Sequence, residues 1–374
     1  MIKTLFVFGT RPEAIKLCPV LLRLWQEPEV FEVKVCVTAQ HRGMLDQVLS
    51  VFGVVPDFDL DLMQSGQTLS QVTGRMMIAL EPVLDAAQPD LVVVQGDTTT
   101  TFCGALTAFY KHIPVAHVEA GLRTGDLRQP FPEELNRVLT GRIAALHFAA
   151  TESAAENLRR EGVERQSIFV TGNSGIDAVL QIQARLQRNP LPAPPYLMPD
   201  KKLVLVTAHR RESFGSGFDG ICEGIRRIAQ EQDVQVVYPV HRNPNVIDPV
   251  ERILGDLPRV TLIPPLEYVA FVDLMTRSML LLTDSGGVQE EGPSLGKPIL
   301  VMRERTERPE AVTAGTVRLV GTDPAQIAAE ALKLLRDPQE RLLMSRVHNP
   351  YGDGHASERI AGVIRSFHKE KTLD

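Results

Sequence analysis

Three acidic residues stand where they could transfer protons. Asp97 and Glu119 each follow a short apolar, β-branched run, and Glu133 comes directly after a proline that can open a helix. In that helix Glu133 would share a face with Asn136 and Arg137. Carboxylates in one site repel each other, and this repulsion raises the pKa of at least one of them towards the range used in acid–base catalysis.

Simpler explanations exist for each acid taken alone. Asp97 could be a helix N-cap, as could any of the threonines that follow it, and Glu133 could interact favourably with a helix dipole. Three carboxylates could also bind a metal ion, but no DxD-like cluster accompanies the phosphate pattern described next, so a metal site is not expected. Glu134 would point away from the shared face, and we expect it to be solvated. No serine or cysteine stands in an elbow sequence, which argues against a covalent hydrolase.

The stretch 284–291, DSGGVQEE, is suited to binding a nucleotide. It follows an apolar run and begins a short helical pattern, so backbone N–H groups at the helix start would be free to bind a phosphate. Gly286 and Gly287 would let a ligand approach the backbone closely, and Ser285 adds a hydroxyl donor. Glu291 could accept hydrogen bonds from a ribose diol. An ordinary strand–helix turn is the alternative interpretation.

Basic residues follow other strand ends, where they could bind a small anion. Arg11 and Lys16 lie in GTRPEAIK, which is neither a Walker A loop nor a GxGxxG motif. His209 begins HRRES after an apolar run, and His241 follows a similar run. Arg308 could bind a phosphate or a nucleotide hydroxyl with its guanidinium group. Solvated charges or a core histidine are the alternatives for these residues.

The elements that must position these side chains alternate between strand and helix along the whole chain. This alternation predicts an α/β fold in which helices cover both faces of parallel sheets. The predicted strands of the first half are 4–8, 33–38, 91–95, 115–118, 146–149 and 168–171. Those of the second half are 203–207, 234–238, 260–263, 279–283, 299–302 and 317–320. Parallel strands end at one sheet edge, so the candidate residues should gather there.

A proline-rich stretch, 189–199, separates the two series of elements and predicts a linker. We therefore expect two doubly wound, Rossmann-like domains facing across a cleft. The first is 1–188, with a C-terminal helix at about 357–369 packing back on it, and the second is 200–356, which would bind the nucleotide.

Composition excludes several classes of protein. The net charge of −6 gives no reason to expect nucleic acid or an anionic membrane as a partner. The four cysteines (Cys18, Cys36, Cys103 and Cys222) are far apart without metal spacing, which fits a reducing cytoplasm. The first three lie in apolar patterns that are typical of core positions. The apolar run at the N-terminus is too short for a signal peptide, and no segment is long enough to span a bilayer.

Seven long motifs, in order, resemble the non-hydrolysing UDP-N-acetylglucosamine 2-epimerase family. They are FGTRPEAIK (8–16), GDTTTT (96–101), HVEAGLRTGD (117–126), PEELNR (132–137), HRRESFG (209–215), DSGGVQEE (284–291) and TERPEAVTAGT (306–316). The similarity runs from residue 3 to about 365. It implies the two-domain GT-B fold and interconversion of UDP-GlcNAc and UDP-ManNAc in bacterial cell-surface polysaccharide biosynthesis. A homodimer is also implied.

The resemblance assigns roles to individual residues. Those that match UDP-binding positions are Arg11, Lys16, His209, Ser285, Gly286, Gly287, Glu291 and Arg308, with Phe271 near the uracil. Those that match catalytic carboxylates are Asp97, Glu119 and Glu133, with Arg137 beside them. Gln40, Arg210 and His241 resemble part of a second UDP-GlcNAc site, where the substrate acts as an activator. Leu266 departs from the pattern, because some relatives carry glutamine there.

Chemistry narrows the route by which carbon 2 would be inverted. Its C–H bond is not beside a carbonyl in the ring, so direct deprotonation would leave an unstabilised carbanion. No dinucleotide fingerprint is present, so neither oxidation at carbon 3 nor a cofactor is expected. The remaining route expels UDP while a base removes the proton, giving 2-acetamidoglucal, and UDP then adds back. Cations and backbone N–H groups would stabilise the departing UDP. Which carboxylate is the base and which the acid stays open.

Three other functions fit parts of the pattern. A hydrolysing epimerase would release UDP and N-acetylmannosamine, but the intact HRRES and DSGGVQEE motifs favour the non-hydrolysing branch. A GT-B glycosyltransferase would not need three carboxylates at the sugar. A nucleotide-sugar-binding regulator without turnover would not need the intact acids either.

His209 is added to the candidate catalytic residues because of its place beside the expected diphosphate.

Overall fold

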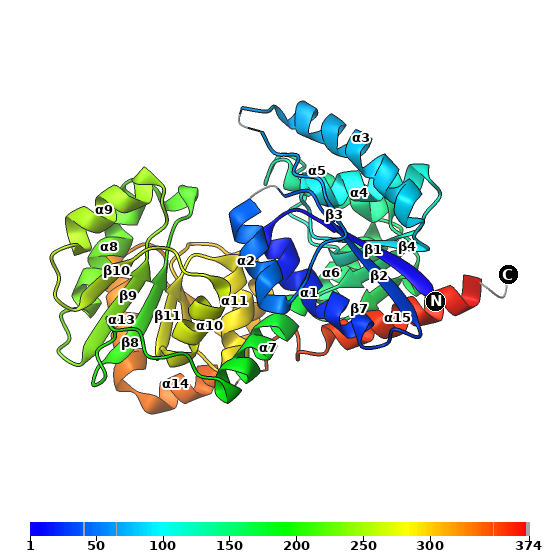
Figure 1. Cartoon of the computed structure of the whole chain (residues 1–374). Coiled ribbons are helices and arrows are strands. Elements are labelled where there is room, and N and C mark those ends of the chain that lie inside the picture. The colour runs from blue at the N-terminus through cyan, green and yellow to red at the C-terminus, as the bar shows by residue number, and fades with distance from the viewer. Residues whose placement is uncertain (40–41, 65, 347, 372–374) are drawn as a thin grey trace. The chain divides into compact units, whose positions relative to one another are not determined.

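The computed structural model describes residues 1–39, 42–64, 66–346 and 348–371, and these form two compact units. Unit 1 consists of Met1–Ala178 together with Gly352–Asp374, and unit 2 is Val179–Tyr351. Each unit contains one parallel sheet with helices on both of its faces (Figure 1). The predicted α/β class with two doubly wound sheets is therefore confirmed.

The sheet of unit 1 has seven parallel strands in the order β3-β2-β1-β4-β5-β6-β7. Apolar, β-branched sequences make its central strands, and all residues of β4 are buried, as expected for strands covered on both faces. The strands are β1 (Ile2–Phe8), β2 (Phe31–Val37), β3 (Phe58–Asp59), β4 (Leu91–Gln95), β5 (Val115–Ala120), β6 (Leu146–Ala149) and β7 (Ile168–Val170).

Helices connect these strands, and four of them begin at a threonine side chain that caps the helix. Thr10, Thr68, Thr98 and Thr151 each accept a hydrogen bond from the backbone three residues on. The helices are α1 (Arg11–Trp25), α2 (Arg42–Phe52), α3 (Leu69–Ala87), α4 (Thr99–Tyr110), α5 (Glu133–Ile143), α6 (Glu152–Arg160) and α7 (Ser174–Arg188), with a 3-10 turn η1 (Arg165–Ser167).

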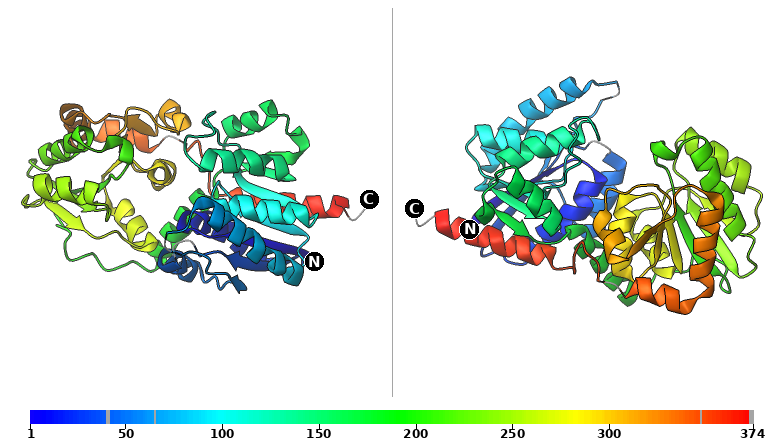
Figure 2. Two further views of the ribbon diagram at one scale, coloured as in Figure 1. Left: turned by 90° about the horizontal axis from the view of Figure 1, so that it is seen from above. Right: turned by 180° about the vertical axis from the view of Figure 1, so that it is seen from behind.

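The last helix, α15 (Ala356–Lys371), returns to unit 1 and packs against α1 (Figures 1 and 2). Asp177 accepts hydrogen bonds from the backbone N–H groups of Ala356 and Ser357, at 3.2 and 2.8 Å, so it caps the start of this helix. Arg365 forms an ion pair with Glu27 at the end of α1.

The sheet of unit 2 has six parallel strands in the order β10-β9-β8-β11-β12-β13. They are β8 (Lys202–Thr207), β9 (Val234–Pro239), β10 (Val260–Ile263), β11 (Leu280–Thr283), β12 (Ile299–Val301) and β13 (Val317–Leu319). The helices are α8 (Ser216–Ile228), α9 (Pro244–Leu254), α10 (Tyr268–Arg277), α11 (Gly286–Glu291), α12 (Pro309–Ala314), α13 (Pro324–Arg336) and α14 (Pro338–Ser345), with 3-10 turns η2 (Arg211–Ser213) and η3 (Gly292–Leu295).

Two details differ from the sequence expectations. The short strand β3 was not predicted, because two residues are too few to give a periodic signal. The division between the units falls inside α7, earlier than residue 188, so this helix contributes to both units. Residues 189–201 contain no helix or strand and belong to unit 2, where the Leu191 carbonyl accepts a hydrogen bond from Arg277.

Candidate active site

The loop that carries Arg11 in unit 1 is held by a buried carboxylate. Glu13 accepts hydrogen bonds from the N–H groups of Gly9 (3.0 Å) and Thr10 (2.8 Å) with one oxygen. Its other oxygen accepts hydrogen bonds from the hydroxyls of Thr98 (2.7 Å) and Thr101 (3.2 Å). Burial raises the pKa of Glu13, while these hydrogen bonds oppose the rise. Glu13 thus ties the loop after β1 to the loop after β4.

Glu119 lies at the end of β5 in a conformation that side chains rarely adopt. Its φ is +62°, and the strand register shifts between Val118 and Ala120. Lys16 Nζ lies 2.5 Å from one carboxylate oxygen, and the Gln95 amide donates a hydrogen bond to the other. The side chain of Glu119 is only 10% exposed, so both of its oxygens are held by donors inside the site. A strained backbone kept in place by such contacts is typical of a functional position.

Asp97 lies beside this pair and is held from α5. Arg137 Nη2 is 2.9 Å from Asp97 Oδ2, and the Asn136 amide donates to the Asp97 carbonyl at 2.9 Å. Burial raises the pKa of Asp97 to about 6, with Arg137 opposing the rise and Glu119 adding to it. Asp97 can therefore gain and lose a proton near neutral pH. The N-cap of α4 is Thr98, so the alternative interpretation of Asp97 as the N-cap is wrong.

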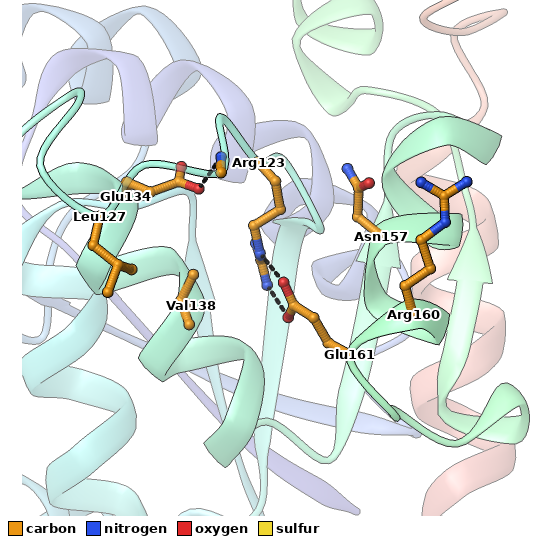
Figure 3. A pocket seen from close by; sticks show the side chains of 8 residues that line it. Arg123, Leu127, Glu134, Val138, Asn157, Arg160 and Glu161 are labelled. Carbon is orange, nitrogen blue, oxygen red and sulfur yellow. Dashed lines mark hydrogen bonds and ion pairs between the residues drawn. The ribbon is translucent and has the colours of Figure 1, made fainter.

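The first two residues of α5 lie in different surroundings. Glu133 is half-buried and close enough to Asp97 to raise its pKa. Glu134, predicted to be solvated, is instead 1% exposed, and this prediction is wrong. Its carboxylate turns back to the preceding loop and accepts hydrogen bonds from the N–H groups of Thr124 (2.9 Å) and Gly125 (3.1 Å). Figure 3 shows Glu134 together with Arg123 of this loop. The helix pattern alone does not reveal this, because the acceptor role depends on a folded loop.

Further contacts hold the segment between Glu119 and α5. Arg123 donates two hydrogen bonds to Glu161, at 2.7 and 2.9 Å, and these residues line a pocket of about 360 Å³ together with Glu134 (Figure 3). His117 is fully buried, and its Nε2 lies 2.7 Å from the carbonyl oxygen of the residue before Asp97. Burial lowers the pKa of His117 to about 3, so it is neutral and donates this hydrogen bond.

Unit 2 places the motif 284–291 directly after β11. Asp284, which is fully buried, accepts hydrogen bonds from the N–H groups of His209 (2.6 Å) and Arg210 (2.7 Å). Asp284 therefore fixes the HRRES loop beside the start of α11. The imidazole of His209 is 39% exposed and stacks on His241, with ring centroids 5.3 Å apart.

The start of α11 gathers most of the predicted nucleotide residues. A Cβ atom on Gly287 would lie 3.9 Å from Glu291 Oε1 and 4.0 Å from Ser285 Oγ, so these three residues surround one small region. A Cβ atom on Gly286 would lie only 2.8 Å from the guanidinium carbon of Arg308. A side chain at position 286 would therefore displace this guanidinium.

The guanidinium of Arg308 is itself anchored. Its Nη2 lies 2.8 Å from Glu290, which is buried, and its Nη1 lies 2.9 Å from Glu307. Tyr268 donates a hydrogen bond to Glu291 at 3.4 Å. Phe271, on α10, and Leu266, just before it, are half-buried. Charged groups thus hold Arg308 beside the start of α11, and Tyr268 contacts the end of this helix.

The predicted residues thus form two groups, one in each unit. Unit 1 brings together Lys16, Asp97, Glu119, Glu133 and Arg137, with Arg11 half-buried at the start of α1. Unit 2 brings together His209, Arg210, His241, Ser285, Gly286, Gly287, Glu291 and Arg308. Gln40 lies outside the described residues.

Four polar residues of the site were not singled out from the sequence. They are Glu13, Gln95, His117 and Glu134. Only Glu13 had a usable signal, because Thr10 and Glu13 have the spacing of a capping box. The others act through contacts between elements that are distant in sequence.

Neither a metal site nor a membrane span stands out in the described part of the chain. No group of three or more histidine, cysteine, aspartate or glutamate side chains there could hold a metal ion. Two of the catalytic candidates pair with cations instead, Glu119 with Lys16 and Asp97 with Arg137. Among the described residues no helix is long and apolar enough to cross a membrane.

Comparison with known proteins gives concordant matches. A family model described as UDP-N-acetylglucosamine 2-epimerase matches residues 23–365. The UDP-N-acetylglucosamine 2-epimerases of Salmonella typhimurium strain LT2 and Escherichia coli strain K12 are each 57% identical to this chain, covering 98% and 97% of it and 99% and 98% of their own lengths. The crystal structure of UDP-GlcNAc 2-epimerase from Neisseria meningitidis bound to UDP-GlcNAc is 46% identical, with a TM-score of 0.90, and covers 97% of this chain and 99% of its own.

Proposed function

Since this chain belongs to the UDP-N-acetylglucosamine 2-epimerase family, with its GT-B type fold, we propose that it is a non-hydrolysing member that interconverts UDP-GlcNAc and UDP-ManNAc. The observation that carries this proposal is the cluster of Asp97, Glu119 and Glu133, in which Asp97 has a pKa of about 6. A reaction that moves a proton off carbon 2 and back to it needs acidic groups of this kind.

The nucleotide is assigned to unit 2. Ser285, Gly286 and Gly287 would bind the diphosphate through hydroxyl and backbone N–H groups, with Arg308 adjacent, and Glu291 would bind the ribose. Phe271 would lie near the uracil. The Neisseria meningitidis relative was solved with UDP-GlcNAc bound, which supports this choice of ligand.

The sugar is assigned to unit 1, whose cations would also help the diphosphate leave. Lys16 and Arg11, together with His209, would stabilise the charge that develops on UDP as its bond to carbon 1 breaks. Ring-oxygen lone pairs share the positive charge at carbon 1, as in glycoside cleavage. Loss of the carbon 2 proton then gives 2-acetamidoglucal, and UDP adds back after protonation from the opposite face.

The structure gives the carboxyl groups unequal abilities in these proton transfers. Asp97, with its raised pKa, can exist in both protonation states at neutral pH. Glu119 has a lysine on one oxygen and an amide donor on the other, so its side chain is held in place from both sides. We therefore assign the exchangeable proton to Asp97 in one of the two transfers, with Glu133 as the second group.

Proton NMR of UDP-GlcNAc incubated with the protein in D2O tests the proposal. We expect UDP-ManNAc carrying deuterium at carbon 2, in equilibrium with deuterated substrate and without added metal or NAD. Free UDP and N-acetylmannosamine as the main products would instead place the chain among hydrolysing epimerases. Full activity in both Asp97→Asn and Glu119→Gln would show that the catalytic residues are wrongly assigned.

Further parts of the proposal concern the setting of the enzyme. We place it in the cytoplasm, where its product would serve cell-surface polysaccharide biosynthesis, and we assign Gln40, Arg210 and His241 to a second, activating UDP-GlcNAc site. Sigmoidal dependence of the rate on UDP-GlcNAc would support that site.

A homodimer is proposed as well, because α3 and α4 pack together and expose large apolar side chains, Ile78, Phe109 and Tyr110. Light scattering of the purified protein measures the oligomeric state.

A further inference from the structure

We propose that Glu134, a residue outside the predicted site, is a positioning residue that shares the guanidinium of Arg137 with Asp97 and so sets the proton affinity of Asp97. The inference rests on the proposed function only for its effect on turnover. The physical link between the three side chains stands on the geometry of unit 1 alone.

Glu134 uses its two carboxylate oxygens for different purposes. Oε1 accepts hydrogen bonds from the backbone N–H groups of Thr124 and Gly125, at 2.9 and 3.1 Å. Oε2 makes no hydrogen bond within the described residues and lies 3.4 Å from Arg137 Nε, which has none either. Holding the loop requires only Oε1. The second carboxylate oxygen, Oε2, therefore faces Arg137 and is not used to hold the loop.

Arg137 connects this buried charge to the catalytic candidate. Its side chain is 12% exposed, and while Nε faces Glu134, Nη2 lies 2.9 Å from Asp97 Oδ2. The guanidinium thus lies between two carboxylates and neutralises both in part.

The charges around Asp97 determine what removal of Glu134 would do. The groups facing it are Lys16 from α1, Glu119 from β5, and Glu133 and Arg137 from α5. With Glu134 neutral, the charge of Arg137 would act on Asp97 alone, which favours the ionised form of Asp97. The pKa of Asp97 should then fall, so that less of it carries the proton at neutral pH.

The variant Glu134→Gln isolates the contact with Arg137. The carbonyl oxygen of the glutamine can keep both hydrogen bonds from the loop, so its NH2 group must face Arg137 Nε. Two donors would then meet there, and the negative charge of Glu134 would be absent. Glu161→Gln is the matched control, because Glu161 holds the same loop through Arg123. Glu134→Asp keeps the charge and serves as the conservative variant.

Carbon-13 NMR of protein labelled at the aspartate side-chain carboxyl carbons measures the effect directly. The Asp97 signal is identified by its loss in Asp97→Asn, and its titration should be centred at about pH 6 in the wild type. We expect the midpoint to fall by about half a pH unit or more in Glu134→Gln and to stay within that margin in the control and in Glu134→Asp. An unchanged midpoint in Glu134→Gln, or an equal fall in Glu161→Gln, would overturn the proposal.

Turnover gives a second readout, which separates this inference from the proposed function. We expect kcat to fall about tenfold or more in Glu134→Gln with KM for UDP-GlcNAc little changed, because the nucleotide is assigned to unit 2. A wild-type protein that does not epimerise UDP-GlcNAc would contradict the proposed function, while the NMR titration would still decide the role of Glu134. A rise of KM with unchanged kcat would also contradict a positioning role.

Discussion

Replacing Asp97 by asparagine should abolish epimerisation and at the same time stabilise the folded protein at neutral pH. Asparagine has nearly the shape of a protonated aspartate and carries no charge into the site. In the wild type, burial disfavours the ionised carboxylate more strongly than Arg137 favours it, because the pKa of Asp97 is raised overall. Folding therefore works against the charge that catalysis uses.

The size of the effect follows from the pKa of Asp97. The rise from 3.8 to about 6 corresponds to about 3 kcal/mol, at 1.36 kcal/mol per pKa unit. The side chain is 30% exposed, so solvent screening reduces this value, and we expect the free energy of unfolding to increase by about 1–3 kcal/mol in Asp97→Asn. For a unit of this size that is a rise in Tm of roughly 3–9 °C.

The pH dependence identifies the cause. The pKa of Asp97 is higher in the folded than in the unfolded protein. Asp97 therefore does not destabilise the folded wild type below pH 3.8, its unfolded pKa, and it lowers the free energy of unfolding increasingly as pH rises towards about 6. The advantage of Asp97→Asn should thus be full at pH 7.5, about half as large at pH 5, and absent near pH 3. Thermal unfolding of both proteins at several pH values measures it.

Asp126→Asn is the matched control, since Asp126 is an exposed aspartate in the same unit. It should change stability by no more than about 0.5 kcal/mol at any of these pH values. The reasoning is refuted if Asp97→Asn is no more stable than the wild type at pH 7.5, or if its advantage is the same at pH 5.

Three further substitutions test other parts of the site. Glu13→Ala should lower the free energy of unfolding by about 3 kcal/mol or more, measured by thermal or urea denaturation, because it removes the buried acceptor for five donor groups near the ends of β1 and β4. A loss under about 1 kcal/mol would contradict this. Gly286→Ala should weaken UDP binding about tenfold or more in calorimetry, since the new Cβ would lie 2.8 Å from the guanidinium carbon of Arg308. Gly217→Ala is the control and should leave binding unchanged, because its Cβ would lie 3.7 Å from the nearest atom. Gln95→Leu should reduce kcat about 10- to 100-fold, because Glu119 loses a hydrogen-bond donor inside the site. An unchanged kcat would show that Lys16 alone is enough to hold Glu119 in place.

Much of the architecture was predictable because it depends on local patterns. Runs such as 91–95 and 280–283 are continuous and apolar, which is typical of strands covered on both faces, and they became β4 and β11. Since parallel strands end at a common edge, the position of Asp97 and Ser285 directly after such runs was enough to predict where they would lie.

Other features of the site came only from the fold. The helical pattern separated Glu133 from Glu134 by the face each would occupy, but a loop folded over α5 buries Glu134 and gives its carboxylate two N–H donors. Gln95 gave no signal, because its amide acts on Glu119 across neighbouring strands. A sequence pattern records which face a residue occupies and not what will cover that face.

The sequence by itself determined the two parallel sheets, their strand positions and the residue types delivered to the strand ends, because periodicity and strand direction act locally. Tertiary structure alone decided the chemical state of those residues. The positive φ of Glu119, the partners on both of its oxygens and the pKa of Asp97 all arise from groups distant in sequence that packing brings within a few ångströms. Desolvation and charge act through space, so proton affinity in this site is a property of the folded unit.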